Sequence, residues 1–358
     1  MDDTLFAIAA SQGGVVMRSQ AVAAGYTEGE IRRRRQRRQW VAIRRGAYVD
    51  RVVFAAMNRD QRHVAMIHAV VRSLERPAVV SHASAAVFRG LPSWGLDLSL
   101  VHVTRGDLHS PRIEGGVHHH AGELRNDDVE QVNGIWVTSP ARTAIDTARV
   151  TAFEAALVVT DAMLHRGLVG KGTILGRLES MRDWPGTCNA GRVAEFADGR
   201  SESVGESRSR VAFELVGLPR PDLQRLITTA DGRIVGRSDF VFDEFWTIGE
   251  FDGRVKYGRL LKPGEDPGDA VWREKQREDR MRDLGYEVGR LVWSDLSDRP
   301  AIAARFRAAF TRARRRRAVL IWRVTPGTAH GAAKSAELHQ DCGPFTSVRR
   351  MVNGPPGW

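Results

Sequence analysis

The pattern of apolar and polar positions divides much of the chain into helices and strands. Apolar residues recur at helical spacing over residues 60–74, from Val64 to Leu74, which predicts an amphipathic helix. Residues 98–103 alternate, and residues 135–138 are β-branched or aromatic, as is typical of strands. The chain is therefore expected to combine helices with sheets.

The first 50 residues predict two helices, a third basic helix and a two-stranded hairpin. Ser19 is a candidate N-cap for the second helix. Thr27 and Glu30 have the spacing of a capping box, so the third helix should begin there. The hairpin is expected over residues 40–49. This order is that of a winged helix-turn-helix.

Arginine dominates the third helix and the hairpin turn: nine arginines and two acids lie between Arg18 and Arg45. Guanidinium groups in such density suit the phosphates of double-stranded DNA. A merely solvated basic face is the alternative. The candidate DNA-binding residues are Arg32, Arg33, Arg34, Arg35, Arg37, Arg38, Arg44 and Arg45.

The overall composition agrees with an acidic polymer as partner. Lys and Arg number 54 against 43 Asp and Glu, a net charge of +11. A coding bias toward arginine accounts for part of this excess. Two distant cysteines, Cys188 and Cys342, form no disulfide framework or Cys-based zinc motif. Without a secretory leader pattern or an apolar run of about 20 residues, we expect a cytoplasmic protein with no membrane partner.

Changes in pattern along the chain predict a multidomain protein of α+β and α/β class. Residues 1–50 form the winged helix, and residues 51–195 a mixed α/β middle domain. Residues 196–312 form an α/β domain that begins with a helix near residue 203. Residues 313–358 are expected to be a basic, largely disordered tail.

Three adjacent histidines, His118, His119 and His120, raise a metal hypothesis. Because neighbours in a strand point to opposite faces, at most two of the three could share a ligand set. His82 and His102 are not placed by the sequence. A histidine-rich strand or loop is the favoured interpretation.

Residues 238–253 predict a β-hairpin. Aromatic and β-branched runs flank Asp243 and Glu244, which we take as a two-residue turn. In that register Phe242 pairs with Phe245.

The same register gathers carboxylates on one face. Asp239 lies opposite Ile248, so Asp239, Glu250 and Asp252 share a face, with Asp239 and Glu250 about 7–8 Å apart at Cα. Glu206, on the preceding helix, can add another oxygen ligand. Carboxylates held in this way suit a hard divalent cation, so Glu206, Asp239 and Glu250 are candidate ligands for Mg²⁺ or Mn²⁺. An exposed acidic hairpin without chemistry is the alternative.

Several short motifs follow one another over residues 196–296. They are Glu206-Ser207 with Arg210, Gly217-Leu218-Pro219, Asp239-Phe240, Glu250-Phe251-Asp252-Gly253, Arg277 and Gly285-Tyr286-Glu287-Val288. In this order they resemble the Vsr-like and DUF559-type branch of the PD-(D/E)XK nuclease superfamily. The resemblance implies a restriction-endonuclease-like domain in which Glu206, Asp239 and Glu250 bind Mg²⁺ and Lys256 assists. Asp252 stands where many members carry the catalytic lysine. The candidate catalytic residues are Asp239, Glu250, Asp252 and Lys256.

A second resemblance covers residues 1 to about 150. It is carried by Arg45-Gly46-Ala47-Tyr48, by residues 81–86 with 90–92, and by residues 138–143 with Asp146. These stretches resemble the AbiEi-type antitoxin and regulator family. The resemblance implies promoter binding by the winged helix and a cognate toxin as a possible partner.

Three hypotheses follow. The first is a Mg²⁺-dependent DNA endonuclease positioned by its winged helix. The second is a non-catalytic AbiEi-type autoregulator whose nuclease-like domain is degenerate. The third is an interaction module with incidental basic charge. The sequence does not fix the oligomeric state.

Overall fold

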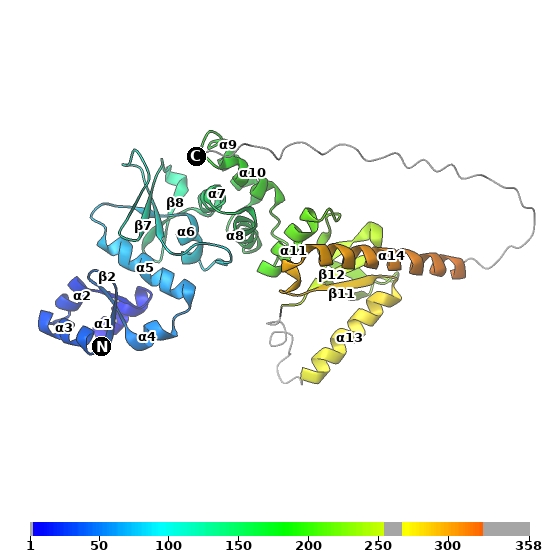
Figure 1. Cartoon of the computed structure of the whole chain (residues 1–358), viewed down its shortest axis with the longest axis horizontal. Helices are drawn as coiled ribbons and strands as arrows, with labels where there is room; N and C mark the ends of the chain where they lie inside the picture. The colour runs from blue at the N-terminus through cyan, green and yellow to red at the C-terminus, as the bar shows by residue number, and fades with distance from the viewer. Residues whose placement is uncertain (1–2, 254–266, 325–358) are drawn as a thin grey trace, which may run out of the picture. The chain divides into compact units, whose positions relative to one another are not determined.

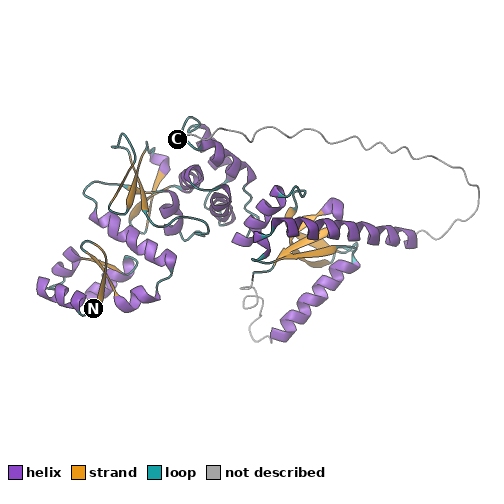
Figure 2. Ribbon diagram, in the orientation of Figure 1, coloured by secondary structure: helices purple, strands orange, loops and turns teal. Residues whose placement is uncertain are grey.

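The computed structural model describes residues 3–253 and 267–324, which form helices and three separate β-sheets (Figures 1 and 2). The expected mixture of α and β structure is therefore confirmed. Among these residues, no helix combines the length and the hydropathy that a membrane span requires.

The N-terminal part places a basic helix beside a small sheet. The order β1-β3-β2 is antiparallel throughout. Its elements are α1 (Asp3–Ser11), β1 (Val15–Met17), α2 (Arg18–Ala23), α3 (Glu28–Gln36), β2 (Trp40–Arg44) and β3 (Ala47–Asp50). The predicted three helices and hairpin are present. The strand β1 was not predicted.

The capping box at the start of α3 is confirmed, because Thr27 Oγ1 accepts from the Glu30 amide at 3.2 Å. The N-cap predicted at Ser19 is wrong. Helix α2 starts one residue earlier, and Met17 holds the N-cap position. The Met17 amide donates to the Gln20 side chain at 2.9 Å, so the strand β1 runs directly into the helix.

The middle part is built on a six-stranded sheet of order β6-β7-β5-β4-β9-β8. The helix predicted over residues 60–74 and the strand over residues 135–138 are confirmed, whereas the strand predicted from residue 98 begins at Val101. The elements are α4 (Arg51–Ala56), α5 (Arg59–Ser73), β4 (Val79–Val80), α6 (His82–Phe88), β5 (Val101–Arg105), β6 (Arg112–Glu114), β7 (Val117–Ala121), β8 (Val129–Val132), β9 (Ile135–Thr138), α7 (Pro140–Val150), α8 (Phe153–His165), α9 (Lys171–Glu179) and α10 (Thr187–Phe196).

A buried ion network holds α7 in place. The Arg142 guanidinium, 1% exposed, donates to Asp146 at 2.7 Å and to Asp128 at 3.0 Å. A buried charge needs such partners. The motif around Arg142 and Asp146 is therefore part of the packed interior.

The C-terminal part has a four-stranded sheet, β10-β11-β12-β13, with helices on both faces. Strands β10, β11 and β12 form an antiparallel meander, and β13 joins β12 in parallel after the crossing helix α13. The elements are α11 (Val204–Leu215), β10 (Asp222–Thr228), β11 (Ile234–Phe242), β12 (Thr247–Phe251), α13 (Pro267–Asp283), β13 (Glu287–Leu291) and α14 (Arg299–Val324).

The two faces of this sheet carry different cores. Phe240 packs with Phe213 of α11 and Phe306 of α14. Val241 and its neighbours pack with Met281 of α13 on the opposite face. Strand alternation explains the division, since consecutive side chains point to opposite sides.

The tail predicted over residues 313–358 begins inside a helix. Helix α14 continues to Val324, so residues 313–324 are helical, contrary to the prediction. The rest of the predicted tail lies outside the described residues.

Candidate acidic site

The hairpin that carries the acids has a longer turn than predicted. Phe242 pairs with Thr247, not with Phe245, because a short 3₁₀ turn intervenes and Trp246 adopts a φ of +46°. The register therefore differs by two residues. A two-residue shift preserves the faces of both strands, since side chains alternate with period two.

Asp239 and Glu250 therefore still lie on the same face of the sheet, and the observed register brings them closer together than the predicted one. Val241 lies opposite Ile248, and both pack toward α13. Two residues further along each strand, the same register places Asp239 directly opposite Glu250. The predicted register had placed these two acids diagonally. Asp252 follows β12, is half-buried, and donates its amide to the Leu291 carbonyl at 2.7 Å.

Glu206 and Asp239 meet through an amide that the sequence did not single out. Gln224 Nε2 donates to Glu206 Oε2 at 2.9 Å and to Asp239 Oδ1 at 3.2 Å. Asp239 Oδ2 accepts from the Phe251 amide at 2.8 Å, so its carboxylate bridges β11 and β12. The helix start holds Glu206 in place, because Ser203 Oγ donates to its Oε1 at 2.8 Å.

The carboxylates of Glu206 and Asp239 are both buried, and their negative charges repel each other. Glu206 is 3% exposed and Asp239 is 8% exposed. Burial, and after it the charge of Asp239, raises the pKa of Glu206 above its ordinary value. A cation between the two groups would remove this cost.

Gln224 adds two further signs of an oxygen-ligand site. Its Oε1 is buried and has no hydrogen-bond partner within the described part of the chain. Its backbone has a φ of +52°, which a non-glycine residue adopts at an energetic cost. Rotation of the Gln224 side-chain amide by 180° would direct Oε1, in place of Nε2, toward the two carboxylates. A hard cation bound there requires oxygen ligands of this kind. The donor set therefore fits Mg²⁺ or Mn²⁺.

Glu250 has a different neighbour. The Arg277 guanidinium on α13 donates to Glu250 Oε1 at 3.3 Å and to Glu274 at 2.6 Å. In residues 3–253 and 267–324, the side chains placed closely enough to share a metal ion are those of a histidine set, and Glu206, Asp239 and Glu250 do not form such a group. The structure thus brings Glu206 and Asp239 together and holds Glu250 on an arginine. Lys256 lies outside the described residues.

The predicted DNA-binding arginines divide into two groups. The exposed ones lie on and after α3 and at the hairpin turn: Arg32, Arg33, Arg35, Arg37, Arg38 and Arg45. One of these exposed side chains, Arg35, also lies over the ring of Tyr48. The other two are less exposed and are engaged within the protein. Arg34 lies over the rings of Tyr26 and Trp40, and Arg44 donates to the Gly115 carbonyl and to Ser73.

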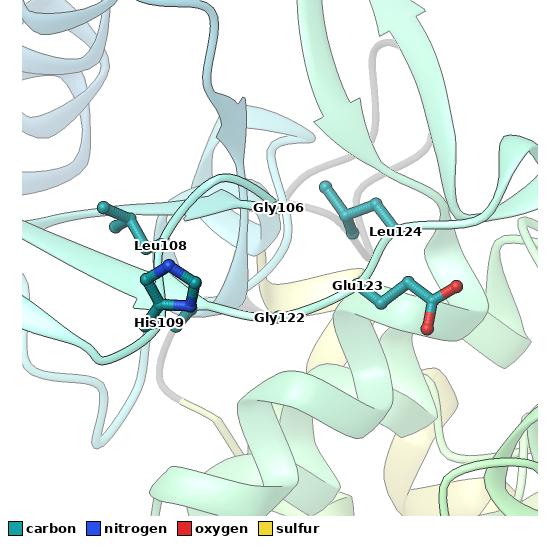
Figure 3. Close-up of a pocket in the computed structure, with 7 residues that line it drawn as sticks. Gly106, Leu108, His109, Gly122, Glu123 and Leu124 are labelled. Carbon is teal, nitrogen blue, oxygen red and sulfur yellow. The ribbon is translucent and has the colours of Figure 1, made fainter.

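One concavity lies elsewhere, beside the ends of β5 and β7 (Figure 3). Its lining includes Gly106, Leu108, His109, Gly122 and Glu123, and none of the predicted site residues. His109 and Glu123 lie on different sides of it in Figure 3. It offers no converging set of acid, base and nucleophile.

Comparison with known proteins gives distant relatives. No family model matches the chain. An uncharacterized protein of Mycobacterium tuberculosis strain CDC 1551 / Oshkosh, and one of strain H37Rv, are each 29% identical to it over 187 residues. The match covers 52% of this chain and 66% of each relative, just under two thirds of their length.

Proposed function

We propose that this protein binds double-stranded DNA through a winged helix-turn-helix and hydrolyses phosphodiester bonds at the Glu206–Asp239 site with Mg²⁺ or Mn²⁺. The observation that carries the proposal is the buried pair Glu206 and Asp239 bridged by Gln224, whose own Oε1 has no hydrogen-bond partner among the described residues. Such a constellation is costly to keep in a protein that makes no use of it.

Each of the described groups has a role that its position supports, and the role of Lys256 is the one that the nuclease resemblance implies. Glu206, Asp239 and the Gln224 oxygen would hold the cation, which when bound supplies Lewis-acid stabilisation of charge on the phosphate. Glu250 would complete the set after leaving Arg277. The freed Arg277 could then bind a phosphate oxygen, with Lys256 offsetting charge that develops there. The proposed fold for this part is a restriction-endonuclease-like α/β domain.

The exposed arginines of α3 support the DNA-binding half of the proposal. Helix α3 follows α2 closely, and the hairpin β2–β3 follows α3, in the order of a winged helix. The side chains of Arg32, Arg33 and Arg35 reach solvent and are absent from the ion pairs of the described residues. Unpaired guanidinium groups are available to phosphates.

A cleavage assay tests the catalytic half. Full-length protein is expected to nick or cut supercoiled plasmid with Mg²⁺ or Mn²⁺ and not with EDTA. Asp239→Ala and Glu250→Ala should each lower the rate at least about a hundredfold, as the loss of a group that acts directly on the reaction does. Asp231→Asn is the matched control, because this acid is exposed in the β10–β11 loop. Undiminished cleavage by Asp239→Ala would refute the proposal.

A second function is favoured by one specific contact. Because Arg277 neutralises Glu250, the site could be closed to metal, as in a non-catalytic AbiEi-type autoregulator with a degenerate nuclease-like domain. A protein that protects a specific site in its own promoter, and cuts no DNA with any divalent metal, would establish this function. A cognate toxin would then be the partner to seek.

A further inference from the structure

Four histidines gather on the middle sheet, separately from the acidic site. Strands β5 and β7 are parallel, with His102 beside His118 and Thr104 beside His120. His118 and His120 share one face, and His119 points to the other, as strand alternation requires. The start of α6 brings His82 onto the shared face, where its ring stacks on that of His120.

Three of these rings present nitrogen atoms to one another. One ligand atom from each of His82, His102 and His120 lies within 4.8 Å of the other two. His102 Nδ1 and His120 Nε2 are 2.9 Å apart. Zinc–nitrogen bonds of about 2.0–2.1 Å place tetrahedral ligand atoms roughly 3.4 Å apart. Small ring rotations would therefore close the set around one ion.

Hydroxyl groups orient the first of these rings. His82 Nδ1 is 2.9 Å from Ser81 Oγ, which accepts from Thr104 Oγ1 at 2.8 Å. With Nδ1 protonated and donating to Ser81 Oγ, Nε2 is the ring nitrogen that can ligate. In metal sites, a hydrogen bond at the second ring nitrogen fixes the ligating one in this way. The ring of His118 stacks on His120 at 3.9 Å between centroids and braces it from the side.

Burial and backbone geometry agree with a site built for a ligand. His82 is 3% exposed and has a φ of +53°, a strained conformation for a residue with a Cβ.

The positive charges of neighbouring arginine side chains do not prevent a metal ion from binding at this cluster. Arg142 and Arg149 both pair with the buried carboxylate of Asp146, and Arg142 pairs with Asp128 as well. Their charge is therefore largely balanced within the protein.

We propose that His82, His102 and His120 form a binding site for a first-row divalent transition metal such as Zn²⁺. An all-imidazole set suits zinc and its neighbours in the series. Three protein ligands leave one tetrahedral position for water or an exogenous ligand. Packing alone explains the cluster less well, because aliphatic side chains would fill the same space without burying ring nitrogens.

The test is zinc binding by untagged, chelator-treated full-length protein, measured by competition with a chromophoric chelator. An Asp239→Asn background keeps the acidic site from contributing. One equivalent of Zn²⁺ is expected, with a rise in melting temperature. His102→Gln and His120→Gln should each weaken binding about a hundredfold or more. His119→Gln is the matched control, because its ring lies next in the strand on the opposite face and should leave affinity unchanged.

X-ray absorption of the zinc-loaded wild type gives a reading that does not depend on whether a variant folds. Scattering from three imidazoles supports the site. Substoichiometric binding, a shell of oxygen ligands, or equal affinity in the folded His102→Gln variant overturns it. None of these results depends on whether the protein cleaves DNA, since the two sites share no residue.

Discussion

At the scale of single residues, the carboxylates that suit the acidic site for a cation lower the stability of the fold when no cation is bound. Glu206 keeps two hydrogen bonds from its helix start, yet burial and Asp239 work against its charge. A group whose pKa is raised by folding stabilises the protein below its ordinary pKa and loses that contribution as pH rises through the folded value. At neutral pH the ionised Glu206 therefore costs stability.

Replacing that charge should raise stability while removing function. Glu206→Gln is expected to increase the unfolding free energy by about 1 kcal/mol at pH 7, with a gain that shrinks as pH falls toward 4.5. Urea denaturation at both pH values measures it. Glu214→Gln, on the same helix, should give no gain, because Glu214 pairs with Arg220. Added Mg²⁺ should stabilise the wild type and not Glu206→Gln. A loss of stability in Glu206→Gln would contradict this account.

At the scale of elements, local signals succeeded where they act over a few residues. The capping box of α3 joins Thr27 and Glu30, which are close neighbours in sequence. The predicted register of the hairpin was wrong by two residues. Trp246 adopts a left-handed backbone conformation, which the identity of its side chain does not predict. A shift of two residues leaves each side chain on the same face of the sheet, so the prediction that Asp239 and Glu250 share a face is confirmed.

The two N-caps predicted in the first part provide a direct comparison. Thr27→Ala should destabilise α3 by about 1 kcal/mol, because the Glu30 amide loses its acceptor. Amide hydrogen exchange over residues 28–36 should then be about fivefold faster. Ser19→Ala should change exchange in α2 little, since Ser19 lies inside that helix. Equal effects of the two substitutions would show that the cap contributes nothing.

At the scale of the whole molecule, the net charge of +11 matters where it is concentrated and unpaired. Many arginines elsewhere are engaged in ion pairs, such as Arg112 and Arg182. The exposed arginines of α3 are therefore the part of this charge best placed to displace counterions from DNA.

Salt dependence separates these groups. The triple substitution of Arg32, Arg33 and Arg35 by Ala should reduce the slope of log affinity against log salt by up to about 3, roughly one for each lost phosphate contact. The control triple, Arg112, Arg125 and Arg182 to Ala, removes the same charge and should leave the slope nearly unchanged. Fluorescence anisotropy with a duplex oligonucleotide measures both. Equal slopes in the two triples would assign binding to overall charge.

The sequence by itself determined the three N-terminal helices, the helix over residues 60–74, the two hairpins and the face on which the acids lie. These follow from periodicity and capping, which depend on residues within one or two turns of each other. Tertiary structure alone decided that Gln224 bridges Glu206 and Asp239, that Arg277 holds Glu250, and that three histidines from α6, β5 and β7 converge. Those meetings join residues far apart in the chain, and their distances depend on strand order and packing, which no local pattern encodes.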